Sequence, residues 1–159
     1  MREAALHAGP SSIYQYVEVP IEDTLASSYY PDGDYPELTS AREAFKNKDY
    51  PSAIAYSQKV IEMYAERAKH MQDSLQEYAW ENAEKIFSYG PLNAVGIAYN
   101  ILGRSYLAID EEAKGIELLK KGINEYYYAQ SWVAEAAMFF RPAEKSWLIL
   151  QAKGIPLKN

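Results

Sequence analysis

The chain has 159 residues, 48% of them apolar, and no cysteine, which suits one compact domain and excludes disulfides, zinc–thiolate sites and cysteine nucleophiles. Its formal charge of −6 argues against a protein that binds nucleic acid mainly through phosphates. The apolar runs are too short to span a membrane, and the opening MREAALHAGP lacks the apolar core of a signal peptide, so we expect a cytoplasmic protein.

Residues 1–36 differ from the rest of the chain in charge and composition. They hold six acidic residues against Arg2, whereas the remainder holds sixteen acidic residues against fifteen basic ones. Prolines and Gly33 interrupt the segment, residues 13–21 alternate like a strand, and YPDGDY at 30–35 has the composition of a turn. We expect an extended acidic N-terminal arm that packs along the helices through its tyrosines; pairing with another chain and mobility are the alternatives.

Helices are predicted to begin near Glu37, where Ser40 and Glu43 form a capping-box pattern. A turn follows at residues 48–50, and Pro51 suits the first position of a second helix. Neither glycine nor proline occurs at 52–89, which favours one continuous or kinked helix. A second capping-box pattern, Ser74 and Glu77 preceded by Asp73, would instead start a new helix there.

Residues 95–123 form the clearest unit of the sequence. Two apolar stripes with helical spacing run through it: Val95, Tyr99, Leu102, Tyr106 and Ile109, then Ile116, Leu119 and Ile123. Only a polar turn at 110–112 joins them, so the two helices must lie antiparallel. We expect Gly103 to face the partner helix, and Gly115 and Gly122 to let the two backbones approach closely.

The C-terminal part predicts a third hairpin. Its first helix covers residues 130–140, and its second helix follows Pro142 and is ended by Gly154 and Pro156. A divergent last pair suits the end of a stack, where apolar surface must be covered. Three consecutive tyrosines stand between the second and third hairpins: Tyr126, Tyr127 and Tyr128. In a helix, consecutive side chains point in different directions around the axis, so we expect at least one of the three to be exposed.

The central unit resembles a tetratricopeptide repeat (TPR), whose 34-residue signature has an aromatic residue, Leu-Gly, Tyr, a small residue and a large one at set spacings. These places hold Tyr99, Leu102, Gly103, Tyr106, Gly115 and Leu119. A weaker likeness covers Asp49, Tyr50, Ala53 and Ile54. The resemblance implies an all-α, TPR-like superhelix of stacked antiparallel helical hairpins over residues 37–159. An ordinary hairpin in an unrelated helical bundle is the alternative.

In TPR folds the first helix of each pair lines a concave groove, and the resemblance therefore also implies a binding site. The matching groove positions are Arg42, Phe45, Lys46, Asn100, Arg104 and Leu107. Arginine and asparagine one helical turn apart can hold a carboxylate by directional hydrogen bonds. We expect a non-catalytic adaptor or chaperone that takes an extended, acidic segment of another protein. The acidic arm is a competing occupant, as a lid on its own groove or as the contact of a homodimer.

Residues that carry chemistry are few. His7 and His70 have no third ligand nearby, and phosphate-binding glycine loops and serine nucleophile elbows are absent, so we expect no metal, no cofactor and no enzyme. The alternative is a small helical enzyme or ligand-binding domain with a tyrosine-lined pocket and Glu77 or Glu81 as its acid. A row of glutamates on one helix face is more often a solvated surface.

Overall fold

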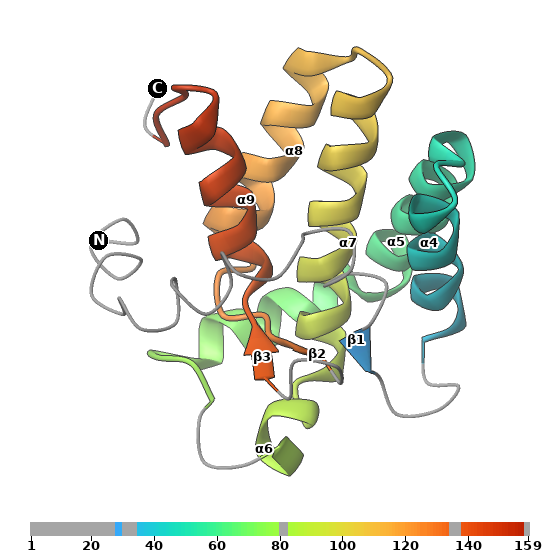
Figure 1. Cartoon of the computed structure of the whole chain (residues 1–159). Coiled ribbons are helices and arrows are strands. Elements are labelled where there is room, and N and C mark those ends of the chain that lie inside the picture. The colour runs from blue at the N-terminus through green and yellow to red at the C-terminus, as the bar shows by residue number, and fades with distance from the viewer. Residues whose placement is uncertain (1–27, 30–34, 80–82, 134–137, 158–159) are drawn as a thin grey trace.

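The computed structural model describes residues 28–29, 35–79, 83–133 and 138–157, and this part of the chain is mostly helical (Figure 1). Its elements, in chain order, are β1 (Ser28–Tyr29), α4 (Pro36–Lys46), α5 (Tyr50–Ser74), α6 (Ala83–Phe87), α7 (Gly90–Ala108), α8 (Glu112–Glu125), β2 (Ser131–Val133), β3 (Met138–Phe140) and α9 (Pro142–Ala152). The predicted all-α class agrees with this content, apart from a small three-stranded sheet.

Helix α7 is the centre of the fold. It packs against α5 and α8 along much of its length and also contacts α4 and α9, and its residues 90–105 are all buried. In Figure 1, α4 and α5 lie to one side of α7, and α8 and α9 lie to the other. Each further helix pair therefore buries its apolar face against the same central rod.

The first hairpin follows the prediction closely. Helix α4 begins at Pro36, next to the predicted start at Glu37. Ser40 lies inside the helix, so the capping box predicted there is wrong. The turn before α5 is confirmed: Lys48 takes a positive φ of 59°, and the Asp49 carboxylate caps α5 by accepting the Ser52 N–H at 3.3 Å. Such a side-chain cap satisfies a backbone donor that has no partner within the helix.

The single helix predicted to reach residue 89 is wrong, because α5 ends at Ser74 and no helix begins there. Leu75 has extended backbone angles, and the following residues leave the helix axis. Three hydrogen bonds hold this segment to a distant loop: Tyr128 N–H to Gln72 Oε1 at 2.8 Å, Tyr128 hydroxyl to Gln76 O at 2.7 Å, and Gln130 Nε2 to Ala79 O at 2.9 Å. The carbonyl groups of Gln76 and Ala79, which a continuous helix would pair internally, are thus paired by residues more than fifty positions away.

The α7–α8 hairpin is confirmed, and so is the close approach at its glycines. A Cβ on Gly115 would lie 2.7 Å from the carbonyl oxygen of Gly103, and one on Gly103 would lie 3.0 Å from that of Gly115. A Cβ on Gly122 would lie 3.0 Å from the Cβ of Tyr99. The two helices therefore touch through backbone atoms, which larger residues would prevent.

The helix predicted over residues 130–140 is wrong. Strands β2 and β3 pair antiparallel, and β1 joins β2 with Ser28 opposite Val133 and Tyr29 opposite Trp132. A short apolar run fits a strand as well as a helix, and here a strand partner from the other end of the sequence decides the outcome. The predicted strand at 13–21 and most of the turn at 30–35 lie outside the described residues, and the boundary at residue 36 between arm and helical domain stays a prediction.

The run of three tyrosines is not helical, because α8 ends at Glu125. Tyr126 stacks on Tyr99 with ring centroids 5.3 Å apart, Tyr127 is buried against Tyr78, and Tyr128 is half-buried. The prediction that one of the three is exposed is wrong. These rings instead join α8 to α7 and to the segment that follows α5.

Helix α9 is confirmed, and Gly154, with a φ of +72°, ends it as predicted. Beyond it, Ile155 and Leu157 pack back on the cluster that holds Leu119, Ile123 and Leu150. The chain after α9 thus covers the apolar side shared by α8 and α9.

Candidate functional site

One side of α7 carries two buried polar residues a helical turn apart, Asn100 and Arg104. The guanidinium carbon of Arg104 lies 4.5 Å from the centre of the Phe45 ring on α4. The Asn100 Nδ2 group donates a hydrogen bond to the Ser146 hydroxyl on α9 at 2.9 Å. Because one turn of α7 contacts both neighbours, α4 and α9 flank the same face of α7.

We call this surface the inner face and define it by Arg42, Phe45, Asn100, Arg104, Lys145 and Ser146, from α4, α7 and α9. Arg42 adds a second guanidinium that is only 6% exposed, and its Nη2 donates to the Ser131 hydroxyl at 3.4 Å. Ser131 is the first residue of β2, so the sheet lies beside the inner face.

Lys145 adds an ammonium group that is 2% exposed. Burial, and then the neighbouring positive charge of Arg104, lower its pKa to about 8, while Glu144 acts in the opposite direction. Both main causes reflect the cost of placing a cation in a desolvated site that already contains one. At pH 7 the group still carries its proton for most of the time.

Next to Lys145, Arg141 and Glu144 form a buried ion pair, with Nη1 and Oε1 3.0 Å apart. The Arg141 guanidinium also lies over the ring of Tyr78 at 3.8 Å, and burial raises the pKa of Tyr78 well above its usual value. Among the described residues the buried charged side chains are Arg42, Arg104, Arg141 and Lys145 against Glu144. The excess of positive charge lies at the inner face, which suits negatively charged ligands.

The structure brings together four of the six partner-binding residues predicted from the sequence: Arg42, Phe45, Asn100 and Arg104. Lys46 is exposed near the end of α4, and half-buried Leu107 packs toward Gly115 of α8. These two residues are not part of the inner face.

The sequence interpretation missed Lys145, Ser146 and Ser131. With a helix predicted over 130–140, α9 would have been the second helix of its pair and would have lain away from the groove. With strands in that place, α9 packs beside α7 and α8, and Ser146 reaches Asn100. The sequence gives no local signal for Lys145, because it stands between Glu144 and Ser146, as a solvated lysine at the start of a helix would.

Of the two acids of the alternative function, Glu77 is exposed and Glu81 lies outside the described residues. Of the two histidines, His70 is exposed and His7 lies outside the described residues. No group of three or more His, Asp or Glu side chains in the described ranges is placed to hold a metal ion. None of the helices from α4 to α9 combines the length and apolar character needed to cross a membrane.

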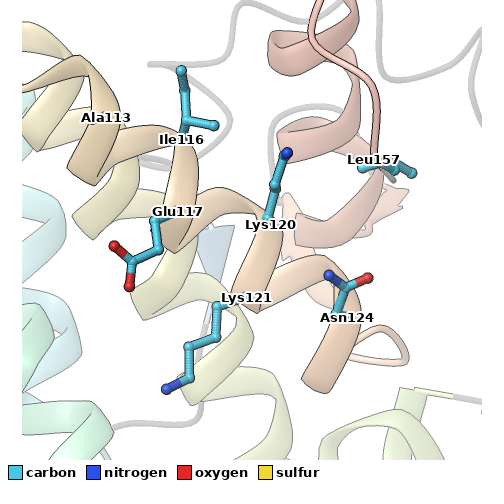
Figure 2. A pocket seen from close by; sticks show the side chains of 7 residues that line it. All are labelled: Ala113, Ile116, Glu117, Lys120, Lys121, Asn124 and Leu157. Carbon is cyan, nitrogen blue, oxygen red and sulfur yellow. The ribbon is translucent and has the colours of Figure 1, made fainter. Parts of the chain in front are cut away.

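A separate open hollow of about 390 Å³ lies on α8 (Figure 2). Its lining consists of Ala113, Ile116, Glu117, Lys120, Lys121 and Asn124 of α8 together with Leu157. Six of its seven lining residues come from one helix, and its lysines are accompanied by Glu117. The hollow therefore lacks the convergence of charged groups from several elements that marks the inner face.

No family model, curated protein or solved structure matches this chain.

Proposed function

We propose that this chain is a non-catalytic interaction module, an adaptor or chaperone, whose inner face takes an extended acidic segment of another protein. The observation that carries the proposal is the convergence of Arg42, Arg104 and Lys145 from three helices. A guanidinium binds a carboxylate through two parallel hydrogen bonds, and these charge-assisted bonds are about twice as strong as neutral ones. The same bonds are stronger in a buried site than in water.

The arrangement of the helices supports a TPR-like fold within this proposal. Helices α4 and α5 form one pair, α7 and α8 the next, and α9 stands where a third pair would begin. The inner face is then the side lined by the first helix of each pair. Helix α6 and the small sheet make the stack irregular.

Asn100 adds a means of holding an extended backbone. Its Nδ2 group is bonded to Ser146, whereas its Oδ1 atom is buried and accepts no hydrogen bond from the described residues. A buried acceptor in this state costs about 1 to 3 kcal/mol. A main-chain N–H of a bound segment would supply the bond, so the face can recognise both the acidic side chains and the backbone of its ligand.

The test is binding of a fluorescein-labelled hexaglutamate peptide, measured by fluorescence anisotropy, with hexalysine as the charge control. We expect Arg104→Gln to weaken hexaglutamate binding by about 10-fold or more, because it removes a charge-assisted contact worth about 1.5 to 3 kcal/mol. Lys46→Gln removes the same charge from an exposed position of α4 and should change the affinity less than twofold. Circular dichroism checks that each variant is folded.

Equal binding by the wild-type protein and Arg104→Gln would contradict the proposal.

A further inference from the structure

The inner face is closed within the chain itself. Arg42, Arg104 and Lys145 are all buried, so an outside segment reaches them only after part of this chain has moved aside. The part of the chain best suited to cover a basic face, and to be displaced from it by a ligand, is an acidic segment.

The sequence before β1 has that chemistry. Residues 1–27 contain Glu3, Glu18, Glu22 and Asp23 against Arg2, and three of these acids fall within residues 18–23. This is the densest acidic stretch in the part of the chain that precedes β1.

Strand β1, which directly follows this segment in the sequence, pairs with β2 beside the inner face. Tyr29 pairs with Trp132, which directly follows Ser131, the residue whose hydroxyl accepts the hydrogen bond from Arg42. Asp23 comes five residues before Ser28, so an extended chain carries it at most about 18 Å from that point. A ligand tethered at this range has an effective concentration of the order of millimolar, which favours it over most ligands in solution.

We propose that the acidic segment 18–23 is the intramolecular ligand of the inner face, and that outside acidic segments bind by competing with it. This proposal rests on the proposed function, since both need the inner face to bind carboxylates. It makes the arm a built-in regulator, because whatever detaches the arm raises the affinity for the partner.

The first experiment neutralises the segment in the full chain with Glu18→Gln, Glu22→Gln and Asp23→Asn together. Hexaglutamate should bind this variant about 10-fold or more tightly than the wild-type protein, because the competitor has lost its charge. The control, Glu62→Gln with Glu66→Gln and Glu117→Gln, makes the same change in net charge at exposed positions of α5 and α8. It should bind as the wild-type protein does.

The outcomes separate the two proposals. Tighter binding in the arm variant alone supports the intramolecular ligand. Equal affinities in the arm variant, the control and the wild-type protein, with binding still lost in Arg104→Gln, overturn the intramolecular ligand and leave the proposed function standing. No binding by any variant overturns both.

A second experiment locates the arm directly and does not depend on an added ligand. The chain has no cysteine, so Thr24→Cys can carry a single nitroxide spin label. We expect the label to broaden the backbone amide signals of Asn100 and Ser146, and a label at Glu62→Cys on the exposed side of α5 to leave them sharp. Sharp signals with the label at position 24 would overturn the proposal.

The same label distinguishes the molecule's own arm from that of a second copy. Unlabelled ¹⁵N protein is mixed with spin-labelled ¹⁴N protein, so that any broadening must come from another molecule. The signals of the ¹⁵N protein should stay sharp. Broadening in this mixture would assign the contact to a homodimer and overturn the intramolecular proposal.

Discussion

At the scale of single residues, Lys145 shows most directly that the inner face is an electrostatically costly site. Its ammonium group is buried beside Arg104, and both effects lower its pKa to about 8. Burial of such a cation lowers the free energy of unfolding whenever the group is protonated. Costly charged groups of this kind concentrate at functional sites, although structural networks also contain them.

The lowered pKa predicts how stability depends on pH. Below pH 8 the group is protonated in both states, whereas between pH 8 and its usual value of 10.5 the unfolded chain holds the proton and the folded chain releases it. The free energy of unfolding should therefore rise with pH in this window, by about 1 to 2 kcal/mol between pH 7.5 and 9.5. Above this window, burial raises the pKa of Tyr126 to about 12, so deprotonation of unfolded tyrosine lowers stability instead.

Urea unfolding at several pH values tests this dependence. Lys145→Met should remove the rise between pH 7.5 and 9.5, and Lys46→Met, at an exposed position, should retain it. A rise of the same size in Lys145→Met would assign the effect to other groups.

At the scale of secondary-structure elements, the α7–α8 hairpin depends on backbone contact at Gly103 and Gly115. Gly115→Ala would gain about 1 kcal/mol in helix propensity. Its new Cβ would lie 2.7 Å from the Gly103 carbonyl oxygen, which belongs to the buried centre of α7 and cannot turn away. Overpacking of this kind costs about 1 to 3 kcal/mol.

Because the gain and the cost oppose each other, we expect Gly115→Ala to lower the free energy of unfolding by a net amount of about 1 kcal/mol, and by no more than about 2 kcal/mol, in urea titrations. Lys114→Ala changes the adjacent, exposed residue of α8 and should stay within about 0.5 kcal/mol of the wild-type protein. If Gly115→Ala proved as stable as Lys114→Ala, the helices would have room to move apart.

The two strands between α8 and α9 explain why α9 reaches the inner face. The sequence predicts one helix at this place, and neighbouring helices of a stack run in opposite directions. Because two short strands replace that helix, α9 runs in the direction opposite to the predicted one. Lys145 and Ser146 then lie beside Asn100 and Arg104 instead of on the opposite side. Strand β1 completes this arrangement, because it supplies the third strand from the other end of the sequence.

At the scale of the whole molecule, α7 contacts α4, α5, α8 and α9, and loss of either hairpin would expose its buried surface. We expect one cooperative unfolding transition, unlike the stepwise behaviour of long repeat arrays. Trp147 on α9 can report one end of the molecule once Trp80→Phe and Trp132→Phe remove the other tryptophans. Its fluorescence and the far-ultraviolet circular dichroism should share one urea midpoint, and two separate midpoints would show that the hairpins unfold independently.

The sequence by itself determined the mostly helical content, the α7–α8 hairpin with its glycine contact, the turn at Asp49 and the start and end of α9. These features depend on periodicity, capping and turn chemistry, which act between residues close together in the chain. The resemblance to a TPR, and not periodicity, pointed to four residues that lie together at the inner face, Arg42, Phe45, Asn100 and Arg104.

Only the tertiary structure decided the end of α5, the strands at 131–140, the burial of the three tyrosines and the place of Lys145. The end of α5 depends on hydrogen bonds from Tyr128 and Gln130, and the sheet depends on β1, more than a hundred residues before β2. Local sequence cannot rank these arrangements, because the groups that stabilise them are brought together only when the chain folds.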